Sequence, residues 1–270
     1  PTRRSSDLFI RQLSYIPMKR LHGKVAVVTA STDGIGFAIA KRLAQEGAKV
    51  VVSSRHQKNV DNAISQLVDI GLKDNVVGTI CHVSKAEDRK RVFDEAIKLG
   101  GLDILVSNAA VSPVMGPTLE CSESAWDKIF EINLKAGFLL AKDAMPLFKK
   151  RGGGRIIFIS SIAGYQPFEL LGAYSVSKTA LVGLTKAISN EVAYDNVTVN
   201  CIAPGIIETK FADQLTQEGP IRDHAISLTA LKRFGTPEDI AGVAAFLASD
   251  DSSYITGETI IASGGMQSRL

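Results

Sequence analysis

Short, uniformly apolar runs alternate with amphipathic helical patterns from Lys24 onward, and this alternation constrains the fold most. Runs that are apolar throughout indicate strands covered on both faces, because a half-exposed strand would alternate apolar and polar residues. We predict strands at Lys24–Ala30, Ala48–Ser53, Asn75–Val83, Leu102–Ser107, Arg155–Ser160 and Val197–Ile202. We predict helices at Gly34–Gln45, Lys58–Ile70, Ser124–Phe148 and Tyr174–Ala193. Strict alternation of strands and helices indicates parallel strands joined by right-handed crossovers.

Length and composition fit one domain with this organisation. The chain has 270 residues, of which 45% are hydrophobic and 22% charged, as in an ordinary globular protein. No internal repeat, low-complexity tract or linker divides it. We therefore expect a single α/β domain over residues 21–270. Its fold should be a doubly wound, Rossmann-like parallel sheet of about seven strands with helices on both faces.

Residues 1–20 differ in composition and are expected to be an N-terminal extension. They hold five basic residues and one acid, so they contribute +4 to a net charge of +3, and the remaining chain carries −1. The basic surplus therefore gives no support to nucleic-acid binding by the fold. Arginine and serine with few acids are typical of a transit peptide. A non-native remnant ahead of a start at Met18 explains the stretch equally well.

The cysteines and apolar runs narrow the class of protein. Cys81, Cys121 and Cys201 are too few and too scattered for a disulfide framework or a metal site, which favours a reducing compartment. We expect no bound metal. The longest apolar runs fall well short of the roughly 20 residues of a membrane-spanning helix, so we expect a soluble protein.

The first predicted strand leads into a glycine-rich turn, Thr29-Ala30-Ser31-Thr32-Asp33-Gly34-Ile35-Gly36. Small residues there allow backbone N–H groups to approach a pyrophosphate at the start of the following helix, where the helix dipole favours an anion. A tight connection between strand and helix also requires glycine, so the turn alone does not decide. The strand before it and the helix after it favour a dinucleotide site.

The end of the second predicted strand reads Ser53-Ser54-Arg55-His56. An NAD site would place Asp or Glu there to accept hydrogen bonds from the ribose. A guanidinium at Arg55 would instead bind a 2′-phosphate through charge-assisted hydrogen bonds. The sequence therefore predicts NADP(H), the alternative being that Arg55 only caps a surface turn.

Tyr174 and Lys178 are four residues apart at a predicted helix start, so they share one helix face. A neighbouring ammonium favours the phenolate and is expected to lower the tyrosine pKa toward neutrality, as general acid–base catalysis requires. Found alone, such a pair is more typical of a solvated helix face.

Ser161, thirteen residues upstream of Tyr174, follows a strand and could bind a carbonyl oxygen, although strand ends also favour serine. Asn133, inside a long predicted helix, indicates either a water site or a satisfied buried amide.

Together these motifs resemble the short-chain dehydrogenase/reductase family over about Leu21–Leu270. The resemblance implies that Tyr174 is the acid–base, that Lys178 lowers its pKa and holds the ribose, and that Ser161 orients the substrate oxygen. Asn133 would anchor a water in a proton relay. The cofactor positions that it implies are Thr29, Ser31, Asp33, Gly34, Ile35, Gly36, Ser54, Arg55, His56, His82, Val83, Asn108, Ala109, Ala110, Tyr174, Lys178, Pro204, Gly205, Ile207 and Thr209.

The chain departs from the usual family pattern at Ala30 in the turn, in Ser107-Asn108-Ala109-Ala110, and at His82, where an aspartate near the adenine is common. The small-for-small changes should be tolerated sterically. The same departures resemble a subgroup of peroxisomal NADP-dependent retinol dehydrogenases and carbonyl reductases. The terminal Ser268-Arg269-Leu270 is a variant of the S-K-L peroxisomal address and implies binding to a peroxisomal import receptor. Cytoplasm is the alternative, or the mitochondrion if the extension is a transit peptide.

The resulting functional prediction is NADPH-dependent reduction of ketones and aldehydes, with reversible alcohol oxidation. The resemblance implies aromatic ketones, α-dicarbonyls and retinal-like carbonyls as substrates and a homotetramer, with the helices of residues 124–148 and 174–193 at one interface. Substrate contacts are expected from Ser161, Tyr174, Val114 and Phe168, within an apolar lining that includes Phe211, or these apolar residues only pack a lid. The alternative function is a catalytically silent NADP(H)-binding scaffold or sensor, which would bind NADPH without reducing any carbonyl.

Overall fold

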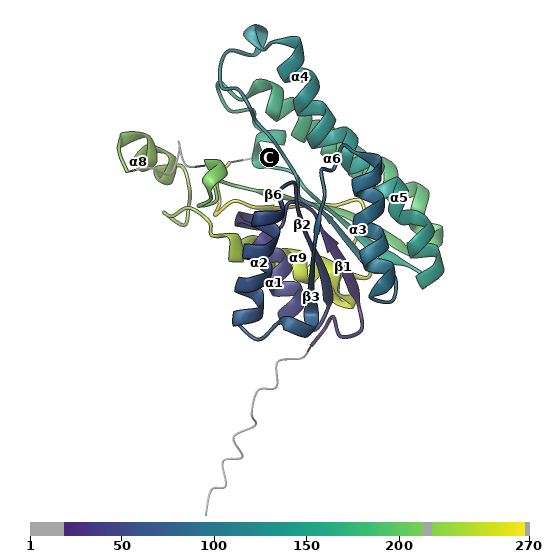
Figure 1. Cartoon of the computed structure of the whole chain (residues 1–270). Coiled ribbons are helices and arrows are strands. Elements are labelled where there is room, and N and C mark those ends of the chain that lie inside the picture. Colours follow the sequence, from purple (N-terminus) through teal and green to yellow (C-terminus); the bar gives the residue numbers. More distant parts are fainter. Residues whose placement is uncertain (1–18, 213–217, 268–270) are drawn as a thin grey trace, which may run out of the picture.

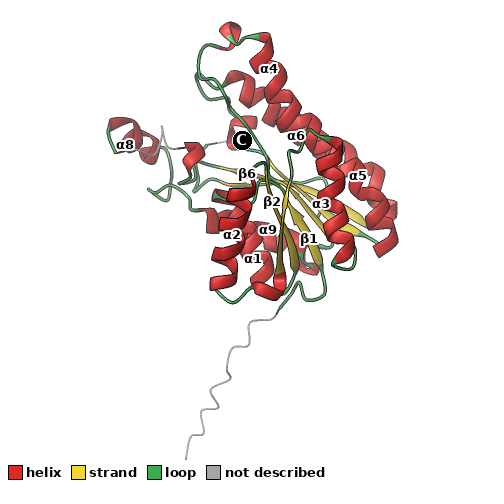
Figure 2. Ribbon diagram, viewed as in Figure 1, coloured by secondary structure: helices red, strands yellow, loops and turns green. Residues whose placement is uncertain are grey.

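The computed structural model describes residues 19–212 and 218–267, and it shows one α/β domain (Figures 1 and 2). Seven strands form a single sheet in the order β3-β2-β1-β4-β5-β6-β7, and every neighbouring pair is parallel. The strands are β1 Val25–Val28, β2 Lys49–Ser54, β3 Val76–Ile80, β4 Ile104–Ser107, β5 Gly154–Ile159, β6 Val197–Pro204 and β7 Thr259–Ala262. The expected doubly wound fold is confirmed.

Helices cover both faces of the sheet (Figure 2). Their bounds are α1 Gly34–Gln45, α2 Gln57–Asp69, α3 Ala86–Lys98, α4 Glu123–Phe130, α5 Ala136–Arg151, α6 Gly172–Val192, α8 Pro220–Ser227 and α9 Pro237–Ala248. Successive residues of a strand point to opposite faces, so β1 contributes Ala26 and Val28 to one apolar core and Val25 and Val27 to the other. The first core lies against α1, α2 and α9, and the second against α3, α5 and α6. This two-sided burial explains why the strands are apolar throughout.

The structure corrects the predicted helix over Ser124–Phe148. It is divided into α4, a π-helical segment over Glu131–Lys135, and α5. Periodicity did not reveal this interruption, because a wide turn inside a continuous helix leaves the apolar spacing nearly unchanged. Single π-helical turns are frequent at functional sites, and this one contains Asn133.

Four elements have no counterpart among the ranges predicted individually. The helix α3 is mostly charged and buries few apolar side chains, so its pattern is weak. The strand β7 is four residues long and lies at the edge of the sheet. The helices α8 and α9 follow the sixth predicted strand, beyond which no helix was predicted. Short and edge elements carry the least periodic signal.

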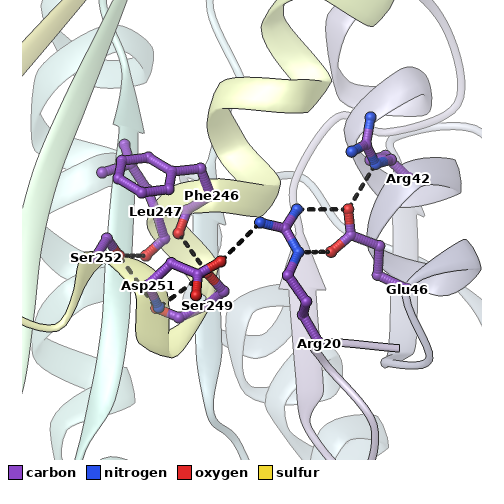
Figure 3. A network of polar contacts seen from close by, with 8 residues as sticks. All are labelled: Arg20, Arg42, Glu46, Phe246, Leu247, Ser249, Asp251 and Ser252. Carbon is purple, nitrogen blue, oxygen red and sulfur yellow. Dashed lines mark hydrogen bonds and ion pairs between the residues drawn. The ribbon is translucent and has the colours of Figure 1, made fainter. Parts of the chain in front are cut away.

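Arg20, at the end of the predicted extension, anchors the chain just before β1 (Figure 3). Its Nε and Nη2 each donate to the Glu46 carboxylate at 2.8 Å, and its Nη1 donates to Asp251 at 3.0 Å. Arg42 Nε donates to the same glutamate at 2.6 Å. The network joins the start of the domain to the end of α1 and to the segment after α9. Residues 1–18 of the extension lie outside the described residues.

The described residues contain neither a membrane-spanning helix nor a cluster of metal ligands. No helix there is long and apolar enough to cross a membrane. No group of three or more His, Cys, Asp or Glu side chains among those residues could hold a metal ion. The C-terminal Ser268-Arg269-Leu270 lies outside the described residues.

Candidate active site

The carboxyl ends of parallel strands form the ligand crevice in an open α/β sheet, and the order of this sheet reverses between β1 and β4. The glycine-rich turn follows β1, Arg55 follows β2, Asn108 follows β4, and Ser161 lies just beyond β5. The fold therefore brings residues from distant parts of the sequence to one edge, as predicted.

Ser161, Tyr174 and Lys178 lie together at this edge. Ser161 caps a short 3-10 helix over Ile162–Gly164, and its hydroxyl accepts the N–H of Ala163 at 3.1 Å. Tyr174 is 8% and Lys178 2% exposed, both in the first turns of α6. The Lys178 Nζ lies 5.5 Å from the centre of the tyrosine ring and donates to the carbonyl of Ile159 at 2.7 Å. The pair is therefore buried, which excludes a solvated helix face.

Burial dominates the ionisation of this pair. It raises the pKa of Tyr174 to about 12, although a hydrogen bond from Ser161 acts in the opposite direction. Burial also lowers the pKa of Lys178 to about 8, while Cys201 acts in the opposite direction. The expected lowering of the tyrosine pKa by Lys178 is therefore wrong for this structure. The Lys178 ammonium bonds to the Ile159 carbonyl, and the loss of hydration is the largest cause of the Tyr174 shift.

Asn133 is a satisfied buried amide, one of the two interpretations that the sequence left open. Its Oδ1 accepts the N–H of Val111 at 2.8 Å, and its Nδ2 donates to the Val111 carbonyl at 3.0 Å. The same Nδ2 donates to the Ser177 hydroxyl at 3.1 Å. The side chain thus joins the π-helical segment to the loop after β4 and to α6. No described contact tests the expected water relay.

Thr29 and Ser31, predicted at the cofactor, are fully buried, and their hydroxyls hold the turn together. The Thr29 Oγ1 accepts the N–H groups of Asn108 at 3.0 Å and Ala109 at 3.3 Å. The Ser31 Oγ donates to the Val28 carbonyl at 2.6 Å and accepts the N–H of Ser53 at 2.9 Å. The structure therefore does not support a direct contact between these side chains and a ligand. They shape the turn instead.

The backbone of the turn forms a tight cradle at the start of α1. A Cβ on Gly36 would lie 2.4 Å from the carbonyl oxygen of Ala30 and 2.5 Å from Asn108 Nδ2, so only glycine fits. Asn108 Nδ2 donates to the carbonyls of Thr29 and Ala30 at 3.1 and 3.0 Å. Ala30, where the family usually has glycine, has a φ of 49°, in the left-handed region. The substitution at Ala30 thus fits sterically but strains the backbone.

Asp33 caps α1 and contacts the segment after β6. Its Oδ1 accepts the N–H of Gly34 at 2.8 Å, and its Oδ2 accepts Lys210 Nζ at 2.6 Å. The hydrogen bond from Lys210 lowers the Asp33 pKa, although partial burial opposes this. Thr209 lies close by, since a Cβ on Gly34 would be 3.2 Å from its methyl group. The predicted positions of the first turn and of the segment after β6 therefore meet.

The adenosine end of the candidate crevice is basic. Arg55 and His56 are exposed after β2, where no carboxylate is present. His82 follows β3, and its Nδ1 lies 3.0 Å from the Ser84 hydroxyl. Burial lowers its pKa, and the positive charges of Lys128, Arg55 and Lys85 lower it further, while Glu131 acts in the opposite direction.

The remaining predicted positions lie at the same edge or follow its strands. Val83 and Ile207 are buried, and Ser54, Ile35, Ala110 and Gly205 are partly buried. Pro204 ends β6. Val114 is 43% exposed, and Phe168 is partly buried. Phe211 lies beside Tyr174, with ring centres 5.8 Å apart and planes tilted by 41°.

Three hydroxyls absent from the predictions also touch the site: those of Ser160, Ser177 and Thr179. A signal for Ser177 was its place inside Tyr174-Ser175-Val176-Ser177-Lys178.

The chain is similar to known oxidoreductases. A family model described as enoyl-(acyl carrier protein) reductase matches residues 29–267. The chain is 57% identical over 252 residues to the Bos taurus dehydrogenase/reductase SDR family member 4, covering 93% of this chain and 89% of the relative. It is 53% identical to the Erythroxylum coca tropinone reductase-like 3, covering 93% of this chain and 96% of the relative.

A solved structure shows the same fold. It is described as an NAD(P) dependent gluconate 5-dehydrogenase from Beutenbergia cavernae with NADP bound at low occupancy. It matches with a TM-score of 0.86 and 32% identity, covering 92% of this chain and 98% of its own. The order of the sheet, the buried Tyr174–Lys178 pair and these likenesses agree: the chain belongs to the short-chain dehydrogenase/reductase family of oxidoreductases.

Proposed function

We propose that this protein is an NADPH-dependent carbonyl reductase that converts ketones and aldehydes to alcohols and catalyses the reverse oxidation. The carrying observation is the buried arrangement of Ser161, Tyr174 and Lys178 at the carboxyl edge of the sheet. A phenol, a hydroxyl that bonds to it and a nearby amine can position a carbonyl oxygen and protonate it. The names of the two relatives, a dehydrogenase/reductase and a tropinone reductase-like protein, support this reaction class.

The residues divide the proton chemistry among them. When bound, the nicotinamide supplies the hydride that adds to the carbonyl carbon. Ser161 donates a hydrogen bond to the carbonyl oxygen, and the Tyr174 hydroxyl gives that oxygen its proton as negative charge develops there. Lys178 stabilises the phenolate that remains, and solvent returns the proton to Tyr174. A pKa of about 12 keeps Tyr174 in its acid form near neutral pH, which supports the reductive direction.

The cofactor cradle fits a dinucleotide. The start of α1 is where backbone N–H groups and the helix dipole can meet a pyrophosphate, and Gly36 allows the chain to pass where any side chain would collide with Asn108. Lys178 is the group that would reach the nicotinamide ribose. The exposed Arg55, with no carboxylate at the end of β2, favours the 2′-phosphate of NADP(H). The NADP bound in the Beutenbergia cavernae structure supports the same choice.

The cofactor preference has a direct test. Arg55→Ala should raise the KM for NADPH about tenfold and leave that for NADH nearly unchanged, since a charge-assisted phosphate contact is worth about 1.5 kcal/mol or more. Lys58→Ala, which removes another cation close in sequence, is the matched control. A wild-type enzyme with higher kcat/KM for NADH would contradict the proposal.

The mouth of the site favours hydrophobic substrates. Val114, Met115, Leu170 and Phe211 are each between 43% and 58% exposed, although they are large and apolar. Such a rim is typical of a binding site for an apolar ligand. We propose aromatic ketones, α-dicarbonyls and retinal-like carbonyls as substrates, with Val114 and Phe168 in contact with them.

One screen tests the reaction. NADPH oxidation is followed at 340 nm over a panel of ketones, aldehydes and dicarbonyls, with an enoyl thioester included because of the matching family model. We expect turnover of carbonyls and its loss in Tyr174→Phe, with NADPH binding retained. Binding of NADPH without any turnover would indicate the scaffold or sensor function, and turnover of the enoyl thioester alone would indicate a different reductase.

We also propose a homotetramer. A groove between α4, α5 and α6 is lined by apolar side chains that include Trp126, Phe130, Phe138 and Leu184. These are the helices expected at an interface, and Phe138 is 44% exposed in the single chain. Light scattering that gives a monomer mass would refute this proposal.

Two short segments of the sequence suggest experiments on the location of the protein. Ser268-Arg269-Leu270 fits recognition by a peroxisomal import receptor. A reporter that carries these three residues should enter peroxisomes, and a diffuse cytosolic signal would count against it. Fusion of residues 1–20 to the same reporter tests the mitochondrial alternative.

A further inference from the structure

Ser177 lies between Tyr174 and Lys178 in the sequence, and its side chain is fully buried. The proposed proton transfer assigns no role to it. Its hydroxyl donates to the main-chain carbonyl of Tyr174 at 2.6 Å. The same oxygen accepts a hydrogen bond from Asn133 Nδ2 at 3.1 Å. Ser177 therefore uses its one hydrogen and one of its two lone pairs within the site.

These bonds form a continuous chain through three elements. Val111, in the loop after β4, exchanges two hydrogen bonds with the Asn133 amide. Asn133, in the π-helical segment, donates to Ser177, and Ser177 donates to the backbone of Tyr174. Ser177 is thus the link between the Asn133 amide and the first turn of α6.

A second hydroxyl bonds to the backbone at the start of α6. Ser160, at the end of β5, donates to the main-chain carbonyl of Lys178 at 2.9 Å. Lys178 Nζ in turn donates to the carbonyl of Ile159. The turn that carries Tyr174 and Lys178 is therefore fixed to β5 by Ser160 and to the π-helical segment by Ser177.

We propose that Ser177 is a positioning residue, which couples Asn133 to Tyr174 and sets where the phenol lies relative to Ser161. The inference rests on the proposed carbonyl reduction. Alanine at this position would leave one Nδ2 hydrogen of Asn133 without its acceptor in a site that is 3% exposed. The amide would then turn or recruit another acceptor, and the first turn of α6 would lose its link to the π-helical segment. Proton transfer depends steeply on such placement.

The test compares Ser177→Ala with Ser189→Ala, a matched control on the same helix. Ser189 is also buried, and its hydroxyl makes the same kind of bond to the carbonyl three residues earlier, Lys186, at 2.9 Å. It has no bond to Asn133 or Tyr174. The measurements are kcat and KM for the best carbonyl substrate, the Kd for NADPH, and the melting temperature of each variant.

We expect Ser177→Ala to lower kcat about tenfold or more, with the KM and the Kd for NADPH within about twofold of wild type. Ser189→Ala should keep the wild-type kcat. In an Asn133→Ala background, the further loss from Ser177→Ala should nearly vanish, because the two residues act through one bond. Equal kcat in Ser177→Ala and Ser189→Ala would overturn the inference. So would a Ser177→Ala substitution that lowers kcat as much in the Asn133→Ala enzyme as in the wild type.

Ser177→Cys covers the case in which the alanine variant does not fold. It keeps nearly the same volume, and a thiol is a weak donor and acceptor, so kcat should still fall by a similar factor. A folded Ser177→Cys enzyme with full kcat would overturn the inference. A wild-type protein that reduces no carbonyl would instead refute the proposed function, so the two failures are distinguishable.

Discussion

Lys178 is a buried cation whose charge the fold disfavours. It is 2% exposed, its ammonium bonds to one carbonyl at 2.7 Å, and burial lowers its pKa from 10.5 to about 8. Replacing it by methionine keeps the aliphatic stem and removes the charge. We therefore expect Lys178→Met to abolish carbonyl reduction while making the folded protein more stable at neutral pH.

The size of the effect follows from the pKa. At about 1.4 kcal/mol for each tenfold change, lowering the pKa from 10.5 to about 8 corresponds to roughly 3 kcal/mol against the charged form. Loss of the bond to Ile159 leaves a buried carbonyl without that donor, which costs about 1 kcal/mol. The net stabilisation of Lys178→Met at pH 7 is then about 2 kcal/mol.

The stability difference between Lys178→Met and the wild type should also change with pH. Between pH 8 and 10.5 the unfolded wild-type chain binds more protons at this lysine than the folded protein does, so wild-type stability rises with pH in that window. Below pH 8 both states are protonated, and the full disadvantage of the buried charge remains. The stability advantage of Lys178→Met should therefore be constant below pH 8, shrink above it by about 1.4 kcal/mol per pH unit and reverse at about pH 9.5.

Urea unfolding at matched protein concentration, followed by the fluorescence of Trp126, measures this difference at several pH values. Lys186→Met, which removes an exposed lysine from the same helix, is the control and should change stability by less than about 0.5 kcal/mol. A Lys178→Met protein that is less stable than wild type at pH 7 would show that the buried ammonium stabilises the fold, and would refute the reasoning.

Three other substitutions test the scaffold of the site. Gly36→Ala should destabilise the fold by about 2 kcal/mol or more and weaken NADPH binding, because its Cβ would lie 2.4 Å from a carbonyl oxygen; unchanged urea midpoint and Kd would contradict this. Ala30→Gly should raise the unfolding free energy by about 1 kcal/mol, because it relieves a φ of 49°, and a fall would show that no strain is stored there. Arg20→Met should destabilise the fold by about 1 kcal/mol above pH 5, because Glu46 loses two bonds. Burial raises the Glu46 pKa, but hydrogen bonds from Arg20 and Arg42 outweigh this effect and lower it below 4.5. The difference in unfolding free energy between Arg20→Met and the wild type should therefore disappear as the carboxylate is protonated below pH 4.5. A pH-independent difference would contradict the ion-pair explanation.

Spacing and strand order made much of the site predictable. Tyr174 and Lys178 lie four residues apart on one helix, and the carboxyl ends of parallel strands meet at one edge, so Ser161 had to lie near them. The role of Ser177 could not be predicted in this way. Its partner Asn133 is 44 residues away, and the bond depends on a π-helical turn that leaves no mark in the apolar pattern.

The direction of the Tyr174 pKa shift also could not be predicted from the sequence. Sequence spacing indicated a nearby ammonium, and attraction alone would lower the pKa of Tyr174. The structure shows a side chain that is 8% exposed, with an ammonium turned toward the Ile159 carbonyl, and burial prevails. How far a side chain is desolvated depends on packing from α6, the loop after β5 and Phe211, which no local motif encodes.

The opposite pKa shifts of Tyr174 and Lys178 have one cause, because burial disfavours the charged form of each. When the phenol gives its proton to a substrate oxygen, the site holds a phenolate near an ammonium. In a low dielectric their attraction is several times stronger than in water, so part of the desolvation that each charge suffers alone is recovered only then. An interaction that is stronger after proton transfer than before it lowers the barrier to that step. The burial that makes Lys178 unfavourable for stability therefore also makes it effective, and this is why we expect Lys178→Met to be more stable and inactive.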